Sequence, residues 1–184
     1  RIGRLEALLT DLLNYSRARR IDSAVETVDL RELIATTWKL LNTDHRMKLD
    51  LDLQLDCDLA EIHLTALEQV LTNLLSNAIK HHDRKNGTVF VSVTEQPEWY
   101  EFMVADDGPG IPDGQRERAF QMFQTLQPRD EVEGSGMGLA IIRKLIERLG
   151  SSIEVDDRSG GRGAEFRFCW PKGAANLNAR EFRG

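Results

Sequence analysis

Three residues suited to metal and phosphate binding recur at helical spacing in the stretch NLLSNAIKHH. Asn73, Asn77 and Lys80 stand at positions i, i+4 and i+7, so a helix would place them on one face, opposite a leucine stripe. An amide oxygen is a hard ligand that suits Mg²⁺, and an ammonium group suits a phosphate. Asparagine is only a middling helix former, so two on one stripe cost some stability unless they have a use. The alternative is a polar face that is merely solvated.

A second candidate stretch is VADDGPGIP, where an apolar run ends on carboxylates. Asp106 closes the run, and Gly108 and Gly110 follow at alternate positions. A carboxylate fixed at a strand end can accept a hydrogen bond from an exocyclic amine such as that of adenine, and glycines let the backbone approach a flat ring. Asp-Gly and Pro-Gly are also turn formers, so this stretch alone leaves an ordinary turn open.

Two further stretches are rich in glycine. In GSGMGLAII, the residues Gly134, Gly136 and Gly138 lead directly into a helical pattern, whose free N–H groups and positive dipole end would face a bound phosphate. The spacing is not the dinucleotide-binding fingerprint, because the third glycine comes one residue early and no strand precedes it. The sequence contains no G-x-x-x-x-G-K-[ST] phosphate loop. The later stretch GGRGAEF, taken alone, is typical of a plain β-turn.

Hydrophobic periodicity and turn signals predict the elements that position these stretches. The dipeptide Asn86-Gly87 is a hairpin signal, which we take to join strand 88–93 to strand 99–106, whose end carries Asp106. Residues 108–136 form a long loop of a kind that is usually functional or disordered. The fold class is therefore α+β, a two-layer α/β sandwich with a mixed, largely antiparallel sheet covered on one face by helices. The expected helices are 30–41, 63–82 and 138–150, and the expected strands are 47–53, 88–93, 99–106, 152–157 and 164–170.

Two helical segments precede the first predicted strand. The segment 1–22 has apolar residues at spacings of three and four, which predicts an amphipathic helix with a seam for a partner helix in a dimerisation bundle. Packing on its own domain is the alternative. Residues 23–29 form a linker, at the end of which Asp29 caps the helix 30–41. The inward residues of that helix are expected to be Leu30, Leu33, Ile34, Leu40 and Leu41.

Length and composition exclude several classes. The 184 residues suffice for one good-sized core, or for a core plus an appendage. A net charge of −6 argues against a nucleic-acid partner. No apolar run approaches the ~18 residues of a membrane span. Cys57 and Cys169 form no metal spacing, so a reducing, cytoplasmic location is expected. Because the chain begins at Arg1 inside a helical pattern, we expect a fragment of a longer protein, which can be membrane-anchored.

In their order along the chain, the four stretches resemble the N, G1, G2 and G3 boxes of sensor histidine kinases. That family belongs to the superfamily that also holds DNA gyrase, the heat-shock chaperone ATPases and the mismatch-repair ATPases. Phe120 and Phe123 resemble the F box of the kinase lid, and LLTDLLNYSR resembles the second helix of the dimerisation and phosphoacceptor domain. The resemblance covers roughly residues 1 to 172. It implies the end of a dimerisation domain at 1–22, a linker at 23–29, an ATP-binding catalytic domain at 30–172 with a mobile lid at 112–133, and a tail at 173–184.

The resemblance also implies roles for individual residues. Asn77 would coordinate Mg²⁺, Asn73 would support the metal or the phosphates, and Lys80 would contact phosphate. Asp106 would accept a hydrogen bond from the adenine amino group. Arg129, the only basic residue in the later half of the lid, is added as a candidate phosphate contact. The other expected nucleotide-binding residues are His81, Gly108, Gly110, Ile111, Gly134, Gly136, Met137, Gly138, Leu139 and Ala164.

The chain departs from the family pattern in three ways. His81 stands where the family often has an aromatic residue, usually tyrosine, and its ring can still stack or bond. Ala164 replaces the usual serine or threonine of the G3 box, so weaker or wetter adenine recognition is expected. No histidine fits the H box, since only His82 precedes an acidic residue and it closes the N-box helix. The acceptor histidine is therefore expected upstream of this chain.

The resemblance implies the ATP-binding catalytic part of a two-component sensor histidine kinase. In the full-length homodimer it would move the γ-phosphoryl group of Mg-ATP to a histidine of the dimerisation and phosphoacceptor domain, and an aspartate of a response regulator would receive it next. An ATP-hydrolysing clamp of the gyrase or chaperone kind is the second class. Those enzymes use a glutamate where this chain has Asn73, an amide that cannot act as a base. A nucleotide-binding pseudokinase is the third class, and the presence of all four boxes argues against it.

Overall fold

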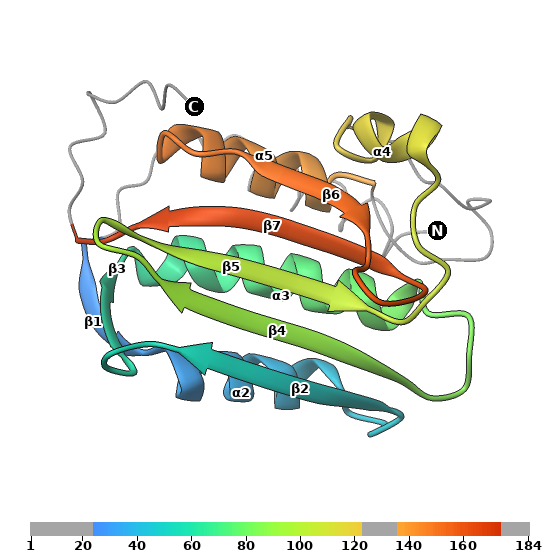
Figure 1. The fold of residues 1–184 in the computed structure, drawn as a ribbon, viewed down its shortest axis with the longest axis horizontal. Coiled ribbons are helices and arrows are strands. Elements are labelled where there is room, and N and C mark those ends of the chain that lie inside the picture. The colour runs from blue at the N-terminus through green and yellow to red at the C-terminus, as the bar shows by residue number, and fades with distance from the viewer. Residues whose placement is uncertain (1–23, 123–135, 174–184) are drawn as a thin grey trace, which may run out of the picture.

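The computed structural model describes residues 24–122 and 136–173. The helix expected over 1–22, the later part of the expected lid and almost all of the expected tail lie outside the described residues. Figure 1 shows the arrangement of the elements. In chain order they are β1 (Glu26–Asp29), α2 (Leu30–Leu41), β2 (Met47–Gln54), β3 (Leu59–Ile62), α3 (Leu64–Lys80), β4 (Gly87–Glu95), β5 (Trp99–Asp106), α4 (Asp113–Ala119), α5 (Gly138–Arg148), β6 (Ile153–Asp157) and β7 (Ala164–Pro171).

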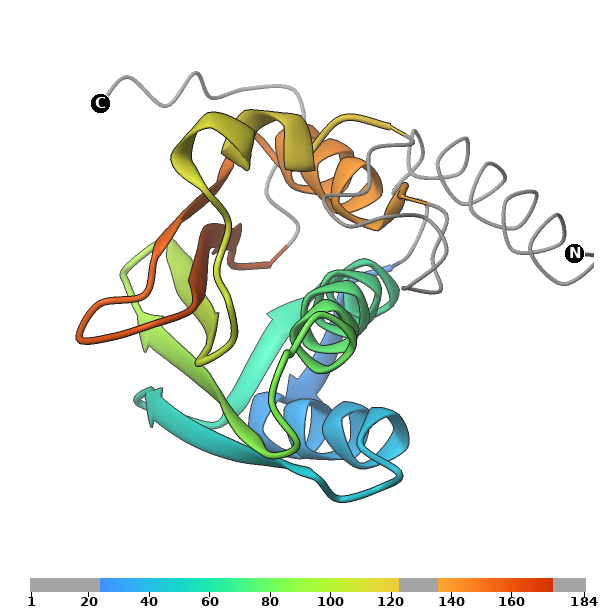
Figure 2. The same ribbon diagram turned by 90° about the vertical axis from the view of Figure 1, so that its right-hand side faces the viewer.

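The main sheet has five strands in the order β2-β4-β5-β7-β6. Strands β2 and β4 are parallel, and the other neighbouring pairs are antiparallel. The helices α2, α3 and α5 lie on one side of this sheet, as the two views in Figures 1 and 2 show. The predicted fold class, a two-layer α+β sandwich with a mixed sheet, is confirmed.

The core between the two layers follows from the hydrophobic patterns. Strands alternate, so that Val89, Val91 and Val93 of β4 are buried while the residues between them are half-buried. Helix α3 carries its apolar residues at helical spacing toward the sheet. Its buried residues are Ala66, Leu67, Val70, Leu71, Leu74, Leu75 and Ala78.

Helix α2 begins as predicted. The side chain of Asp29 accepts a hydrogen bond from the Glu32 N–H at 2.9 Å, which caps the first turn. One expected core residue is wrong, because Leu40 is 74% exposed. Trp38, which was not among the expected inward residues, is buried instead.

Strands β1 and β3 and helix α4 were not predicted. Residues 26–29, at the end of the expected linker, form β1, which pairs with β3 in a separate two-stranded antiparallel sheet. Residues 113–119, in the first part of the expected lid, form helix α4. The hairpin assignment was also wrong in its turn, because Asn86 and Gly87 precede β4. Strands β4 and β5 are instead joined through residues 96–98.

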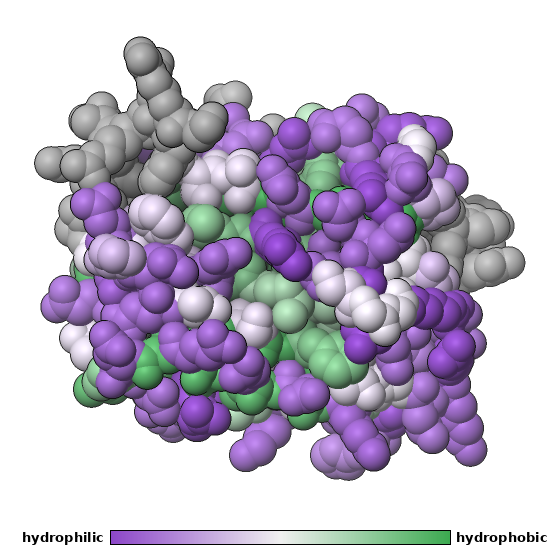
Figure 3. Space-filling model, in the orientation of Figure 1, coloured by the Kyte–Doolittle hydropathy of each residue, from purple (hydrophilic) through white to green (hydrophobic). Residues whose placement is uncertain are grey.

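The helices leave the other face of the sheet uncovered, and Figure 3 views that face. Its surface is mostly hydrophilic, with hydrophobic side chains in the middle and along the lower edge where β2 lies. Phe90, Met103 and Cys169 are half-buried residues of the strands in this face. The guanidinium of Arg158 lies over the Phe90 ring, 4.1 Å from its centroid.

Candidate nucleotide-binding site

Helix α3 places the first predicted cluster beside the start of α5. Asn73 and Asn77 are half-buried and Lys80 is exposed. The Asn73 Nδ2 donates a hydrogen bond to the Gln69 carbonyl at 2.8 Å. Its Oδ1 lies so close to Gly138 that a Cβ there would be 2.5 Å from it. The third glycine of the G-x-G-x-G stretch therefore allows close packing of α5 against this side chain.

The start of α5 has the features of an anion site. Gly136 has a φ of 71°, which an L side chain rarely adopts. Met137 occupies the N-cap and provides no side-chain cap to the first turn. The first N–H groups and the positive dipole end of this helix can therefore serve a phosphate. Met137 as a whole is 0% exposed and lies in the hydrophobic core, so of the predicted phosphate-binding residues it is the one that the described structure buries completely.

Strand β5 ends on Asp106, which is half-buried. Its Oδ1 accepts a hydrogen bond from the Gly108 N–H at 2.8 Å. Burial raises the pKa of Asp106 above its ordinary value, although the N–H groups of Gly108 and Ala164 oppose the rise. A carboxylate in such a place is suited to accept a hydrogen bond from a buried ligand amine, which would replace the lost hydration.

The turn before β7 closes against this strand end. Gly163 has a φ of 125°, and a Cβ there would lie 1.7 Å from the Asp106 carbonyl oxygen. Gly110 has a φ of 75°, and a Cβ there would lie 3.1 Å from the Gly163 carbonyl oxygen. The D-x-G-x-G stretch and the glycine turn 159–163 are thus in direct backbone contact.

A buried histidine connects the end of α3 to the same strand end. The His82 Nε2–H donates to the Asp107 Oδ1 at 2.9 Å, and this oxygen also accepts from the Thr88 N–H at 2.8 Å. Burial alone would raise the pKa of Asp107, but these two hydrogen bonds outweigh it and hold the pKa below its usual value. Sequence reasoning missed this pair, which joins residues 25 positions apart.

An arginine in the β6–β7 turn bonds the segment that follows α3. The Arg162 Nη1 donates to the Asp83 Oδ1 at 3.0 Å, and Nη2 pairs with the second oxygen. The ends of α3 and β5 and the turn 159–163 are therefore held together by polar contacts. No periodicity or motif in the sequence identifies Asp83 and Arg162 as partners.

Helix α4 is fixed to the body of the domain by two arginines. Arg116 pairs with Asp156 at 2.6 Å and with Asp157 at 2.9 Å, both of which belong to β6. Arg143 of α5 pairs with Glu117 of α4 at 2.6 Å. The first part of the expected lid is thus attached to β6 and α5.

Comparison with known proteins identifies the family. The profile described as "Histidine kinase-, DNA gyrase B-, and HSP90-like ATPase" matches residues 63–174. This chain belongs to that ATPase family. The matched region runs from the start of α3 through β7 and contains every segment of the site described above.

Relatives place the chain among the histidine kinases. It is 39% identical over 179 residues to the sensor histidine kinase AruS of Pseudomonas aeruginosa, covering 89% of this chain and 17% of that protein. It is 32% identical over 180 residues to the sensor protein RstB of Escherichia coli, covering 92% of this chain and 40% of that protein. The chain thus spans less than half the length of these two relatives.

Solved structures agree with this placement. The catalytic domain of the histidine kinase ThkA superposes with a TM-score of 0.68 at 28% identity, covering 81% of this chain and 96% of that one. Full-length ShkA in complex with AMPPNP superposes with a TM-score of 0.76 at 27% identity, covering 93% of this chain and 36% of that one. The chain therefore has the fold of a histidine kinase ATP-binding catalytic domain.

The structure brings the four predicted boxes of this ATPase domain into contact. The end of the N box meets G1 through His82, the middle of the N box meets G2 through Asn73, and G1 meets G3 through Gly163. Among the other predicted residues, His81, Ile111 and Leu139 are half-buried, and Ala164 is buried in the core. Arg129 and Gly134 lie outside the described residues.

The donor groups of the ATPase site suit a magnesium ion held largely by phosphates. Residues 24–122 and 136–173 contain no group of three or more His, Cys, Asp or Glu side chains that could hold a metal. The half-buried Asn77 side chain has no hydrogen-bond partner in this part of the chain, so its amide oxygen is available as a ligand. Mg²⁺ commonly takes one or two protein ligands and completes its shell with phosphates and water, and Asn77 fits that pattern.

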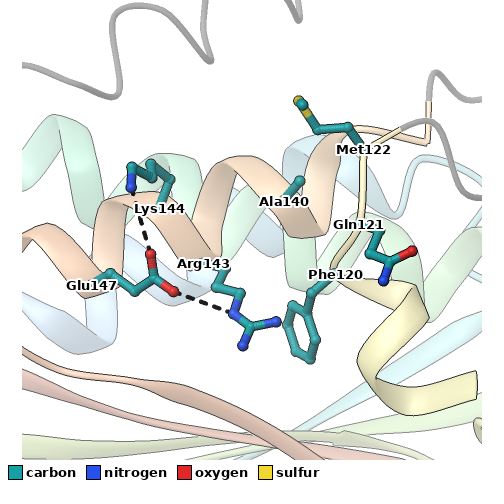
Figure 4. A pocket seen from close by; sticks show the side chains of 7 residues that line it. All are labelled: Phe120, Gln121, Met122, Ala140, Arg143, Lys144 and Glu147. Carbon is teal, nitrogen blue, oxygen red and sulfur yellow. Dashed lines mark ion pairs between the residues drawn. The ribbon is translucent and has the colours of Figure 1, made fainter.

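A separate pocket lies between the end of α4 and α5. It has a volume of about 480 Å³ and contains none of the predicted nucleotide-binding residues. Figure 4 shows the Arg143 guanidinium beside the Phe120 ring and Glu147 between Arg143 and Lys144. The lining residues are Phe120, Gln121, Met122, Ala140, Arg143, Lys144 and Glu147.

In the described part of the chain, no helix has both the length and the apolar composition that crossing a bilayer would take.

Proposed function

We propose that this chain binds Mg-ATP and transfers its γ-phosphoryl group to a histidine of a dimerisation and phosphoacceptor domain. A response-regulator aspartate would receive the group next, as in a two-component system. The observation that supports the proposal is the contact of Asn73 with Gly138, because it joins the face of α3 that we propose to bind metal to the start of α5 that we propose to hold the phosphates. The structure of ThkA in complex with the response regulator TrrA, to which this chain is 28% identical, supports the choice of partner.

Each part of the site has a role in this reaction. Asp106 would accept a hydrogen bond from the adenine amine. The first turn of α5 would hold the phosphates, and Lys80 would neutralise their charge. Bound Mg²⁺, held with the help of Asn77, would withdraw charge from the phosphate oxygens. Phosphoryl transfer needs little more than such positioning and electrostatic stabilisation from the protein.

The nucleophile would come from another domain. The structure describes all four histidines of the chain, and His82, the one that precedes an acidic residue, is buried and bonded to Asp107. A histidine held in this way cannot reach a γ-phosphoryl group. We also place the domain in the cytoplasm, because it carries free cysteines and its proposed substrate is ATP.

Nucleotide titration and a transfer assay together test the proposal. Calorimetry should show that the chain binds ATP in the presence of Mg²⁺ and binds GTP much more weakly. With labelled ATP, it should place acid-labile, base-stable phosphate on the phosphoacceptor domain of its parent protein. Sustained phosphate release without an acceptor would instead indicate an ATP-hydrolysing clamp. Tight ATP binding without transfer or hydrolysis would indicate a pseudokinase.

A further inference from the structure

The His82 side chain lies in the interior beside the strand end that carries Asp106. It is 0% exposed, although the residues on both sides of it are half-buried or exposed. Its Nδ1 accepts a hydrogen bond from the Arg84 N–H at 3.1 Å, and its Nε2–H donates to Asp107 at 2.9 Å. Both ring nitrogens are therefore used, which fixes the orientation of the ring.

The ring occupies space that two glycines leave free. A Cβ on Gly87 would lie 2.2 Å from the His82 Nε2 and 2.5 Å from its Cε1. A Cβ on Gly108 would lie 3.4 Å from its Cδ2. His82 thus packs between the start of β4 and the first glycine of the D-x-G-x-G stretch.

These contacts reach Asp106 through the two residues that follow it, Asp107 and Gly108. Asp107 exchanges two hydrogen bonds with Thr88, because its N–H donates to the Thr88 carbonyl and its carboxylate accepts from the Thr88 N–H. The Gly108 N–H donates to the Asp106 Oδ1. His82 is therefore bonded to the side chain of Asp107 and packed against Gly108, which are the two residues that follow Asp106.

We propose that His82 is a positioning residue for purine selection, holding the Asp106 carboxylate in place through its bond to Asp107 and its packing on Gly108. This inference rests on the proposed function, since it presumes that Asp106 accepts a hydrogen bond from adenine. It adds a residue that lies just beyond the C-terminal end of α3 to the recognition of the base. A histidine that only filled the core would affect stability and leave the choice between ATP and GTP unchanged.

The test compares variants that keep or remove the donor to Asp107. His82→Leu removes the donor, whereas His82→Gln keeps an amide N–H on a chain of similar reach. Calorimetric titrations with Mg-ATP and Mg-GTP are made well below the unfolding temperature of each variant. We expect His82→Leu to lower the ATP affinity about fivefold or more, the effect of losing roughly one hydrogen bond. We expect its preference for ATP over GTP to shrink, and His82→Gln to retain most of both.

A second variant and a matched control separate positioning from stability. Asp107→Ala removes the same bond from its partly exposed side, together with the bond from Thr88. Because the His82–Asp107 bond is shared, the double variant with His82→Leu should lose less affinity than the sum of the two single losses. Glu95→Gln breaks the Glu95–Lys172 ion pair at the opposite end of β4 and should lower stability without changing nucleotide affinity.

Three results would count against the inference. If His82→Leu lowers the unfolding temperature but leaves both the ATP affinity and the ATP-to-GTP ratio unchanged, the role is structural only. If His82→Gln loses as much affinity as His82→Leu, the bond to Asp107 does not transmit the effect. If the unaltered chain binds no ATP, the proposed function itself is wrong, and the positioning role is wrong with it.

Discussion

Replacing Gly163 with alanine should destabilise the domain strongly, because this residue touches the backbone of Asp106. The positive φ of 125° disfavours any residue with a Cβ, at a cost of roughly 1–3 kcal/mol. The added Cβ would also lie 1.7 Å from the Asp106 carbonyl oxygen, and a backbone atom cannot rotate away as a side chain can. The shift that relieves such an overlap costs about 1–3 kcal/mol more. The free energy of unfolding should therefore fall by roughly 2–6 kcal/mol.

Gly160→Ala is the matched control for this measurement. Gly160 lies in the same turn and has a φ of 82°, but a Cβ there would meet nothing within 4 Å. Only the backbone strain of roughly 1–2 kcal/mol should appear. Urea unfolding of both variants, followed by circular dichroism, gives the two losses. The difference between them isolates the overlap with Asp106, and equal losses would refute the reasoning.

Three other predictions follow from the site. Because burial raises the pKa of Asp106, ATP affinity should begin to fall on acidification at a higher pH than an ordinary aspartate would cause. The pKa of Asp106 is higher in the folded than in the unfolded state, so its protonation should not lower the free energy of unfolding. Calorimetric titrations of Asp106→Asn with ATP should show no such pH dependence. Asn77→Ala should keep the fold, since the side chain is only half-buried. Calorimetry should show an Mg-ATP affinity about tenfold lower, which is the effect of losing one strong polar contact. In excess chelator, the variant and the parent should bind ATP with the same affinity. Arg116→Met should detach α4 from β6, which hydrogen exchange would detect as faster exchange in residues 113–119 than in the parent, with α5 unchanged.

The elements that could be predicted from the sequence are those whose own residues show a hydrophobic periodicity. The strict alternation in β2 and the apolar stripe of α3 each show which face is buried. The short strands β1 and β3 carry no such signal, because each forms only by pairing with the other. Helix α4 is polar throughout most of its length and is held by Arg116 and Arg143, whose partners lie elsewhere in the chain.

In the site, too, local features could be predicted from the sequence and contacts between distant residues could not. The four boxes are local, so their residue types and spacing indicated which chemistry they could support. The contacts that hold the boxes together are not local, since His82 bonds a residue 25 positions away and Arg162 bonds one 79 positions away. No spacing rule links such partners, and they became visible only when the fold placed the ends of α3 and β5 and the β6–β7 turn side by side.

The environment of Asn73 bears on our proposal that this site supports phosphoryl transfer and not hydrolysis. Its amide nitrogen donates to the Gln69 carbonyl of its own helix, and this directs its oxygen toward the first turn of α5. A carboxylate at this position would have no N–H for that carbonyl and would place a second acceptor against it. The local backbone thus gives the amide a hydrogen-bond partner that a carboxylate at this position would lack. Water bound near the phosphates would have no strong base at this position, whereas an acceptor histidine brings its own nucleophilic nitrogen.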